Sequence, residues 1–343
     1  MTISVYSTAE LMDVLDIRYK PTTFLTNAFF KSVKLFDKQE IAFDVIKGAR
    51  KLAPFVSPMV QGRAIKRRGQ ETRSFTPAYI KPKMALVPGN AVTRRAGEPF
   101  GGTLSLVERR DLQLADDLLL QSEQIDNTIE WMAAQALCYG YVDVAGDDYP
   151  TVRVDFTRKP THNLALAGVN LWSAATSTPV SNIRTWATTV AQDQGGTVMD
   201  IVLGANVFAA LANHQEFNQL FKYYQPVGGP LPSLLPSVQD NEAKIFHGML
   251  GQFRLWTYNA VYTDDTGVSQ FYIPPNAVLL VASQEMSGTQ CYGAIMDHDS
   301  LVPAARFAKM WKQEDPSVIM TMTQCAPLMV PVNSDSTFFA TVL

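Results

Sequence analysis

Histidine, cysteine and acidic residues are the side chains of this chain that could support a metal site or a nucleophile. The four histidines are separated by dozens of residues and form no H-E-x-x-H or H-x-H pair, so catalysis by a bound metal has little support. His298 lies between Asp297 and Asp299, but neighbouring residues of an extended chain point to alternate faces. We interpret this cluster as a polar turn and expect no metal ion and no cofactor. The histidines are His162, His214, His247 and His298.

Motifs for nucleotide binding and acyl transfer are missing from the sequence. No G-x-x-x-x-G-K-[ST] loop occurs, and the Gly-Gly pairs lack the strand-to-helix setting that cradles phosphate. No G-x-S-x-G elbow occurs either, and Cys291 in GTQCYG has no identifiable base partner, which favours a buried structural thiol. We therefore expect a protein that is not an enzyme. The alternative is an unrecognised hydrolase whose carboxylates or Cys291 meet only in three dimensions.

Basic residues are concentrated between positions 63 and 95, where they face a single acid, Glu71. Three interpretations are open: a nucleic-acid site with Phe75 and Tyr79 as stacking groups, a contact with an acidic patch on a neighbouring subunit, or a solvated hairpin. The chain has 29 basic and 32 acidic residues and a net charge of -3, so it supplies acidic protein surface itself, which favours the neighbouring subunit. The candidate contact residues are Arg63, Lys66, Arg67, Arg68, Arg73, Lys81 and Lys83.

The segment that carries these bases must be extended. Prolines recur between residues 53 and 88 and exclude a long helix, because each lacks an amide donor and biases its predecessor towards extended geometry. Gly62, Gly69 and the dense charge between Pro58 and Pro77 predict a long projecting hairpin.

An aromatic segment precedes this hairpin. Residues 20–47 mix aromatic and polar side chains without a sustained period, which predicts an arm that lies on another surface. Because neither the arm nor the hairpin can bury its apolar residues alone, we expect both to gain stability only on a neighbouring subunit. The expected packing residues of the arm are Phe24, Phe29 and Phe30.

Residues 104–139 carry the clearest helical pattern. Apolar residues such as Ile125, Ile129 and Leu137 recur at helical spacing, and Gly140 is a natural stop. Glu123, Asn127 and Glu130 are expected on the opposite face, in contact with water or a neighbour. An unbroken helix of this length spans about 50 Å, which predicts the spine of an elongated molecule.

The remaining pattern alternates strands with helices and predicts an α+β unit. Residues 141–156 indicate a hairpin, 179–194 a helix, 197–203 a strand and the region through Phe217 a further helix; strands follow at 253–258, 271–273 and 278–281. A capping box at Ser7 and Glu10 predicts a short helix over Leu11, Val14 and Leu15.

The sequence predicts a soluble intracellular protein. Its three cysteines are dispersed, it has no leader with a basic and then an apolar region, and it has no apolar run of about 18 residues.

Two long blocks of sequence resemble the major capsid proteins of the phage lambda type. In residues 55–83, FVSPMVQGRAIKRRGQETRSFTPAYIKPK, an S-P-x-V step, an arginine-glycine tip and an F-T-P-x-Y-x-K-P return follow one another as in the extended loop of that family. YGAIMDHD at 292–299, ARFAKMW at 305–311 and DPSVIMTMTQCAPLM at 315–329 are similar to its carboxyl-terminal third. FLTNAFF at 24–30 matches more weakly.

The resemblance implies the α+β fold of tailed-phage major capsid proteins, with an N-terminal arm, an extended β-hairpin loop, a peripheral domain with a spine helix, and an axial domain. The corresponding expected boundaries are 1–47 for the arm, 48–90 for the extended loop, 91–165 for the peripheral domain, 166–300 for the axial domain and 301–343 for C-terminal strands that complete the core.

The resemblance also implies a function. We expect a major capsid protein that self-assembles into hexamers and pentamers of an icosahedral head enclosing double-stranded DNA, without sequence-specific binding and without a membrane. Expected partners are a decoration protein at three-fold positions, and a scaffold and portal during assembly in the cytoplasm of the bacterial host. An encapsulin-like shell around an enzyme cargo is the alternative from the same fold.

Overall fold

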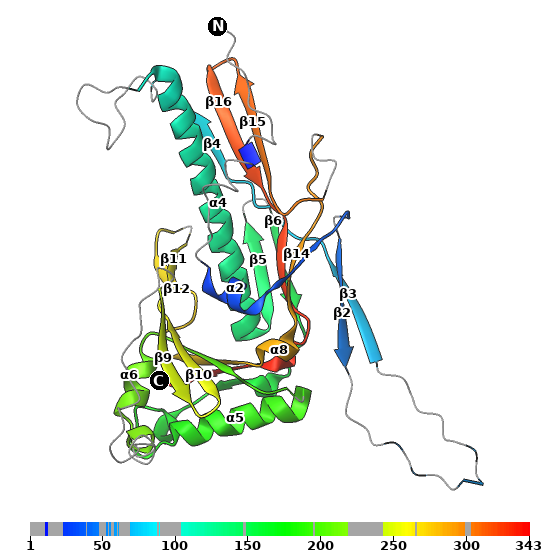
Figure 1. Ribbon diagram of the computed structural model, residues 1–343, viewed down its shortest axis with the longest axis vertical. Coiled ribbons are helices and arrows are strands. Elements are labelled where there is room, and N and C mark those ends of the chain that lie inside the picture. Colours follow the sequence, from blue (N-terminus) through cyan, green and yellow to red (C-terminus); the bar gives the residue numbers. More distant parts are fainter. Residues whose placement is uncertain are drawn as a thin grey trace.

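One long helix runs along the molecule, and the other elements lie beside it and at its C-terminal end (Figure 1). This arrangement comes from a computed structural model. It describes residues 11–12, 23–38, 40–47, 53, 55, 58–59, 61, 69–87, 89, 104–146, 149–194, 196–218, 243–264, 266–298 and 303–343.

The long helix, α4 (Leu106–Tyr139), confirms the expected spine. Ser105 and Glu108 form a capping box: the Ser105 N–H donates to the Glu108 carboxylate at 2.7 Å, and the Glu108 N–H donates to the Ser105 hydroxyl at 3.3 Å. The helix ends where Gly140 adopts a φ of 75° and donates its N–H to the carbonyl of Ala136. Start and stop signals in the sequence therefore set both ends of this element.

Three small sheets lie beside α4. One has the order β15–β16–β4, a second has the order β1–β14–β17, and the third is the predicted hairpin β5–β6. The helix contacts β16, β17 and β5, so strands from the end of the chain pack on an element from its first half. The bounds are β1 (Ser32–Leu35), β4 (Lys83–Leu86), β5 (Tyr141–Gly146), β6 (Tyr149–Asp155), β14 (Gly288–Tyr292), β15 (Phe307–Gln313), β16 (Val318–Gln324) and β17 (Pro327–Pro331).

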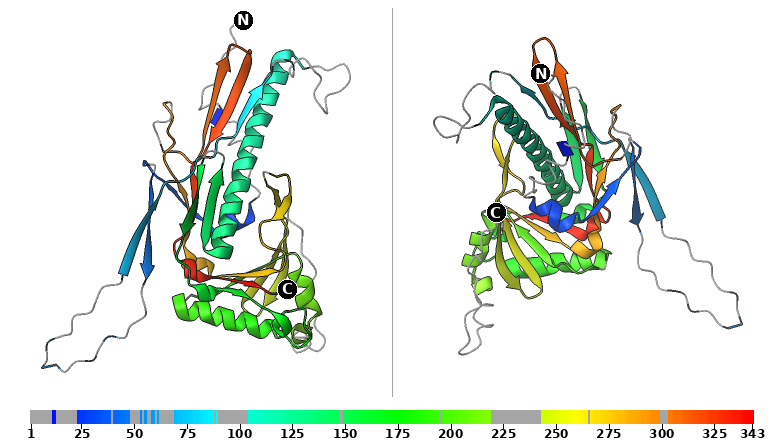
Figure 2. Two further views of the ribbon diagram at one scale, coloured as in Figure 1. Left: turned by 180° about the vertical axis from the view of Figure 1, so that it is seen from behind. Right: turned by 45° about the horizontal axis from the view of Figure 1, so that its top comes forward.

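A six-stranded mixed sheet closes the C-terminal end of α4, with the order β7–β18–β13–β8–β10–β9. The predicted helix is present as α5 (Pro179–Gln194) and runs along this sheet (Figures 1 and 2). Trp186 of α5 stacks on Phe338 of β18 at 5.4 Å between ring centroids, within one apolar cluster. The strands are β7 (Asn163–Ala165), β8 (Asp200–Leu203), β9 (Lys244–Leu250), β10 (Phe253–Tyr258), β13 (Ala277–Val281) and β18 (Thr337–Thr341).

Two hairpins project on opposite sides of the molecule (Figures 1 and 2). β2 (Ile41–Lys47) pairs antiparallel with β3 (Gly69–Phe75), and β11 (Val261–Thr263) pairs with β12 (Ser269–Phe271). The prediction that both strands of the first hairpin lie between residues 58 and 77 is wrong. Only β3 lies there, and its partner β2 comes from the end of the range expected for the arm. The physical reason is that residues 41–47 contain no proline, and every residue can join the ladder.

Short elements complete the fold: α2 (Phe24–Phe29), η1 (Pro160–His162), η2 (Gly168–Asn170), α6 (Val207–Asn213), α8 (Ser283–Met286) and η3 (Ser334–Ser336). The capping box at Ser7 and Glu10 lies outside the described residues. Leu11, which follows it, is helical and buried against Leu114 and Leu118 of α4.

Candidate assembly surfaces and the arm anchor

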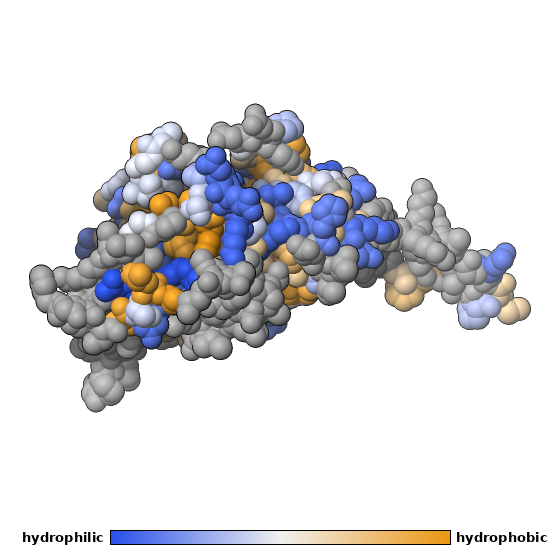
Figure 3. Space-filling model, turned by 90° about the horizontal axis from the view of Figure 1, so that it is seen from above, coloured by the Kyte–Doolittle hydropathy of each residue, from blue (hydrophilic) through white to orange (hydrophobic). Residues whose placement is uncertain are grey.

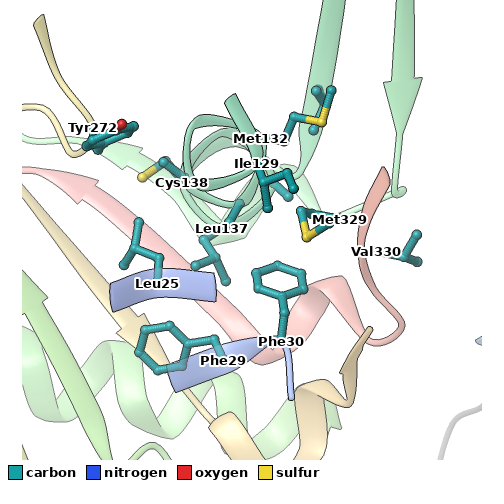
Figure 4. Packing of buried hydrophobic residues seen from close by; sticks show 14 of the residues in the cluster. Leu25, Phe29, Phe30, Ile129, Met132, Leu137, Cys138, Tyr272, Met329 and Val330 are labelled. Atoms are coloured by element: carbon teal, nitrogen blue, oxygen red, sulfur yellow. The ribbon is translucent and has the colours of Figure 1, made fainter. Parts of the chain in front are cut away.

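The aromatic residues expected in the arm lie in the core of their own chain. Phe24, Phe29 and Phe30 are all buried, and Phe24 contacts the ring of Tyr258 with 5.3 Å between centroids. Figure 4 shows Phe29 and Phe30 with Leu25 beneath α4, on the side of the labelled apolar residues of that helix. The expectation that the arm gains stability only on a neighbour is therefore wrong for this segment, because α2 forms part of the main hydrophobic cluster.

Glu130 of α4 anchors this segment. Its Oε1 accepts from the Leu25 N–H at 2.7 Å and the Tyr258 hydroxyl at 2.9 Å. Its Oε2 accepts from the Thr26 N–H at 3.0 Å and the Thr26 hydroxyl at 2.7 Å. The backbone donors belong to the first turn of α2, where Thr23 offers no side-chain cap, so Glu130 supplies that cap from another helix.

Burial and hydrogen bonding have opposite effects on the pKa of Glu130. Loss of hydration raises the pKa of Glu130, and the hydrogen bonds from Thr26, Leu25 and Tyr258 oppose that rise by favouring the carboxylate. Glu130 is buried, so the prediction that it faces water or a neighbour is wrong, whereas Glu123 and Asn127 are exposed. A sequence signal was present, because Ser122, Asp126 and Glu130 are each four residues apart and fall on one side of the helix.

Two other polar residues of α4 bind the C-terminal part of the chain. The buried Gln121 donates to the hydroxyl of Thr321 at 2.9 Å and accepts from the hydroxyl of Thr323 at 2.8 Å, both on β16. Asp126 forms an ion pair with Arg306, and both side chains are largely buried. One helix thus fixes the arm and the C-terminal strands through buried polar contacts as well as apolar packing.

The structure describes three of the seven basic residues that we expected to contact a neighbouring subunit. Arg63, Lys66, Arg67 and Arg68 lie outside the described residues. Arg73 on β3 donates to the carbonyl of Asp155 at 2.9 Å. The exposed Lys81 and Lys83 lie over the rings of Tyr79 and Trp311, at 4.7 and 5.9 Å from the centroids. Each of the three described bases therefore contacts a different part of its own chain.

One Ser-His pair among the described residues has the wrong proton arrangement for catalysis. The N–H of Glu216 donates to His214 Nδ1 at 3.3 Å, so Nε2 carries the ring proton and donates to Ser177 Oγ at 3.1 Å. The Ser177 hydroxyl donates to the carbonyl of Ala174 at 2.7 Å. A nucleophilic serine instead gives its proton to the histidine, so this pair is arranged as a structural contact.

The three cysteines and Asp297 have structural surroundings rather than those of a catalytic site. All three cysteines are buried, which confirms the interpretation of Cys291, and burial raises the pKa of that thiol to about 11. Asp297 binds Lys309 at 2.8 Å and the side chain of Gln324 at 2.9 Å, whereas His298 is exposed. No group of three His, Cys, Asp or Glu residues suited to a metal ion occurs in the part of the chain that the structure describes.

Stability is expected to fall as the pH drops from about 6.5 to about 4, through His247. This side chain is buried on β9, with Nε2 2.8 Å from the hydroxyl of Thr257, and burial lowers its pKa to about 4. Below the ordinary histidine pKa, the unfolded chain binds a proton that the folded chain does not, and the loss is on the order of 2 kcal/mol. Urea unfolding at several pH values tests this: His247→Gln should flatten the slope, and the exposed control His298→Gln should keep it.

Comparisons with known proteins give the family. Residues 7–342 match the family described as phage major capsid protein E. The major capsid protein of Enterobacteria phage P21 is 28% identical over 342 residues, and that of Escherichia phage lambda is 27% identical over 342 residues; each alignment covers 97% of this chain and 98% of the relative. The crystal structure of a prophage capsid protein from Escherichia coli CFT073 has a TM-score of 0.75 at 22% identity, over 99% of this chain and 100% of that one. The chain therefore belongs to the phage major capsid protein E family and is a major capsid protein of a phage head with an α+β capsid fold.

Proposed function

We propose that the chain self-assembles into hexamers and pentamers, which form an icosahedral head around double-stranded DNA. The observation that carries this proposal is the hairpin β2–β3, which projects from the body and whose connecting segment exposes Phe55 and Met59 almost completely. Figure 3 shows apolar and hydrophilic residues of that segment standing apart from the rest of the molecule. Large apolar side chains in such a position fit a surface that becomes covered on assembly.

The boundaries proposed for the subunit follow the family resemblance. Residues 1–47 would be the arm, 48–90 the extended loop, 91–165 the peripheral domain, 166–300 the axial domain and 301–343 the completing strands. Four of the six strands in the mixed sheet, β8, β9, β10 and β13, fall with α5 inside the proposed axial range and support it, whereas β7 and β18 join this sheet from outside that range. The helix α4 supports the peripheral assignment. In the proposed capsomer the axial domains meet at the centre and the extended loop crosses to the adjacent subunit.

The basic residues of the extended loop are proposed to contact acidic surface on that subunit. Charge reversal of Arg67, Arg68 and Arg73 to glutamate should reduce the yield of shells at least tenfold, because it places like charges at each such contact. A matched control reverses the exposed Lys31, Lys38 and Arg184, which changes the net charge equally at other places. Electron microscopy of the high-mass fraction measures the yield. Equal yields from both variants would remove the loop bases from the interface.

Catalysis is not part of the proposed role. The structural use of Ser177, His214 and the three buried thiols supports this, as does membership of a capsid family. The hydrolase alternative would require a compact monomer that stays active without assembly. No helix in the described residues has the length and apolar character needed to cross a membrane.

The proposed partners are those of head assembly: a scaffold and a portal in the host cytoplasm, a decoration protein at three-fold positions, and packaged DNA. The decisive experiment expresses the chain with and without a co-expressed scaffold and images the particles. Uniform shells, purified with DNA or head proteins, support the proposal. Shells that retain an enzyme cargo would support a nanocompartment, and a monomer under every condition would contradict both.

A further inference from the structure

The hairpin β11–β12 has no strand partner among the described residues beyond its own two strands. Val261 lies opposite Phe271 in its ladder, and Val268 follows the turn. These three apolar side chains are 52%, 39% and 55% exposed, respectively. A two-stranded hairpin with an exposed apolar surface is marginal by itself, so something must hold it in shape.

A single carboxylate organises the turn. Asp264 accepts from the N–H of Thr266 at 3.0 Å, the N–H of Val268 at 2.9 Å and the side chain of Gln270 at 2.8 Å. These bonds, with one from the Thr266 hydroxyl, lower the pKa of Asp264 and keep it ionised. The hairpin is therefore ordered before any partner arrives, which reduces the entropic cost of binding.

The base of the hairpin is joined to the spine helix. Tyr272 donates its hydroxyl to the carbonyl of Asn127 at 3.4 Å, and its ring contacts that of Tyr262 with 5.1 Å between centroids. Glu123, one turn before Asn127, is exposed. Residues 259–272 contain Asp264 and Asp265 and no basic residue. The hairpin therefore combines exposed apolar side chains with a net negative charge.

The extended loop on the other side of the molecule has the complementary character. It exposes Phe55 and Met59, and its sequence carries seven bases against one acid between residues 63 and 83. The hairpins β2–β3 and β11–β12 leave the body on opposite sides of α4 (Figures 1 and 2). A ring of identical subunits needs two different, complementary surfaces on opposite sides of each subunit.

We propose that β11–β12 is the docking surface for the extended loop of a second copy of this chain. Phe55 and Met59 of one subunit cover Val261, Val268 and Phe271 of the next, and the basic sequence of the loop is opposite in charge to the acidic sequence of the turn. The apolar character, the charge sign and the position of the two surfaces all favour another copy as the occupant. The inference rests on the proposed assembly and names the surface that receives the loop.

Site-directed crosslinking in assembled shells tests the contact. Met59→Cys and Val268→Cys are combined in one chain and treated with a short bismaleimide; the native cysteines are buried. The expected product is a ladder up to the hexamer. When the two changes are on separate co-expressed chains, each chain can be linked to only one neighbour. The mixed shells should then yield dimers and no higher crosslinked species. A ladder that is absent from intact shells overturns the docking surface. Failure of the parent to form shells contradicts the proposed function instead.

A matched pair makes the test specific. Met59→Cys is combined with Val169→Cys, because Val169 is 73% exposed but lies on η2, which follows the edge strand β7 of the six-stranded sheet and not the β11–β12 hairpin. This pair should give at least tenfold less crosslinked product, and equal product from both pairs overturns the proposal.

A second test removes the apolar side chains of the hairpin. Val268→Ser with Phe271→Ser should reduce the shell yield at least tenfold and leave the melting temperature of the monomer unchanged. Unchanged shell yield would also overturn the proposal.

Discussion

Glu130→Ala is expected to lower the free energy of unfolding by about 3–5 kcal/mol, because four buried donors lose their common acceptor. The donors are the backbone N–H groups of Leu25 and Thr26 and the hydroxyls of Thr26 and Tyr258. All four donors are buried, so hydration does not replace the lost hydrogen bonds. Urea unfolding gives the free energy, and limited proteolysis reports release of the segment around α2.

The control for this change is Glu123→Ala on the same helix. Glu123 is exposed, and its replacement should alter stability by no more than about 0.5 kcal/mol. Glu130→Ala should also expose the arm to protease while α4 stays folded, because the apolar face of that helix keeps its other contacts. Equal stability of the two variants would show that Glu130 is not the anchor of the arm.

Arg306→Met is expected to be similarly costly, by about 3–5 kcal/mol, because it leaves the carboxylate of Asp126 buried without its cation. Asp126 lies on α4 and Arg306 lies just before β15, so the pair joins the helix to the C-terminal strands. The expected consequence is a loosened β15–β16 hairpin. Urea unfolding gives the loss of stability, and amide hydrogen exchange locates it.

Two controls separate charge burial from lost packing. The double change Arg306→Met with Asp126→Leu should regain most of the lost stability, because no buried charge then remains unpaired. Arg153→Met breaks a surface pair with Asp143 and should have a far smaller effect. If the double variant is no more stable than Arg306→Met, the loss comes from packing of the arginine side chain and the electrostatic explanation fails.

Local patterns predicted the elements that depend on neighbours in sequence. The period of Ile125 and Ile129 together with Gly140 predicted α4 to within two residues, and the pattern at 179–194 predicted α5. The hairpin β5–β6 was predicted from alternation around a turn. In these cases capping, helical spacing and turn chemistry act within one element, so the information lies in the adjacent residues.

The partners of the polar residues on α4 were not predictable in the same way. Glu130 has the same charge and a similar place in the helical pattern as Glu123, yet one is buried against Leu25 and the other is exposed. Their difference depends on α2, which lies more than a hundred residues away in sequence. The polar spacing at Ser122, Asp126 and Glu130 indicated a common side of the helix but could not name what would cover it.

The sequence by itself determined the α+β class, the spine helix and the family resemblance of this protein, because these follow from local periodicity and from long collinear blocks. The tertiary structure decided that Phe24, Phe29 and Phe30 complete the core of their own chain, and that β2 rather than the proline-rich segment pairs with β3. It also decided which carboxylates are buried. Burial and strand pairing are set by contacts between distant segments, and these contacts exist only once the chain has folded.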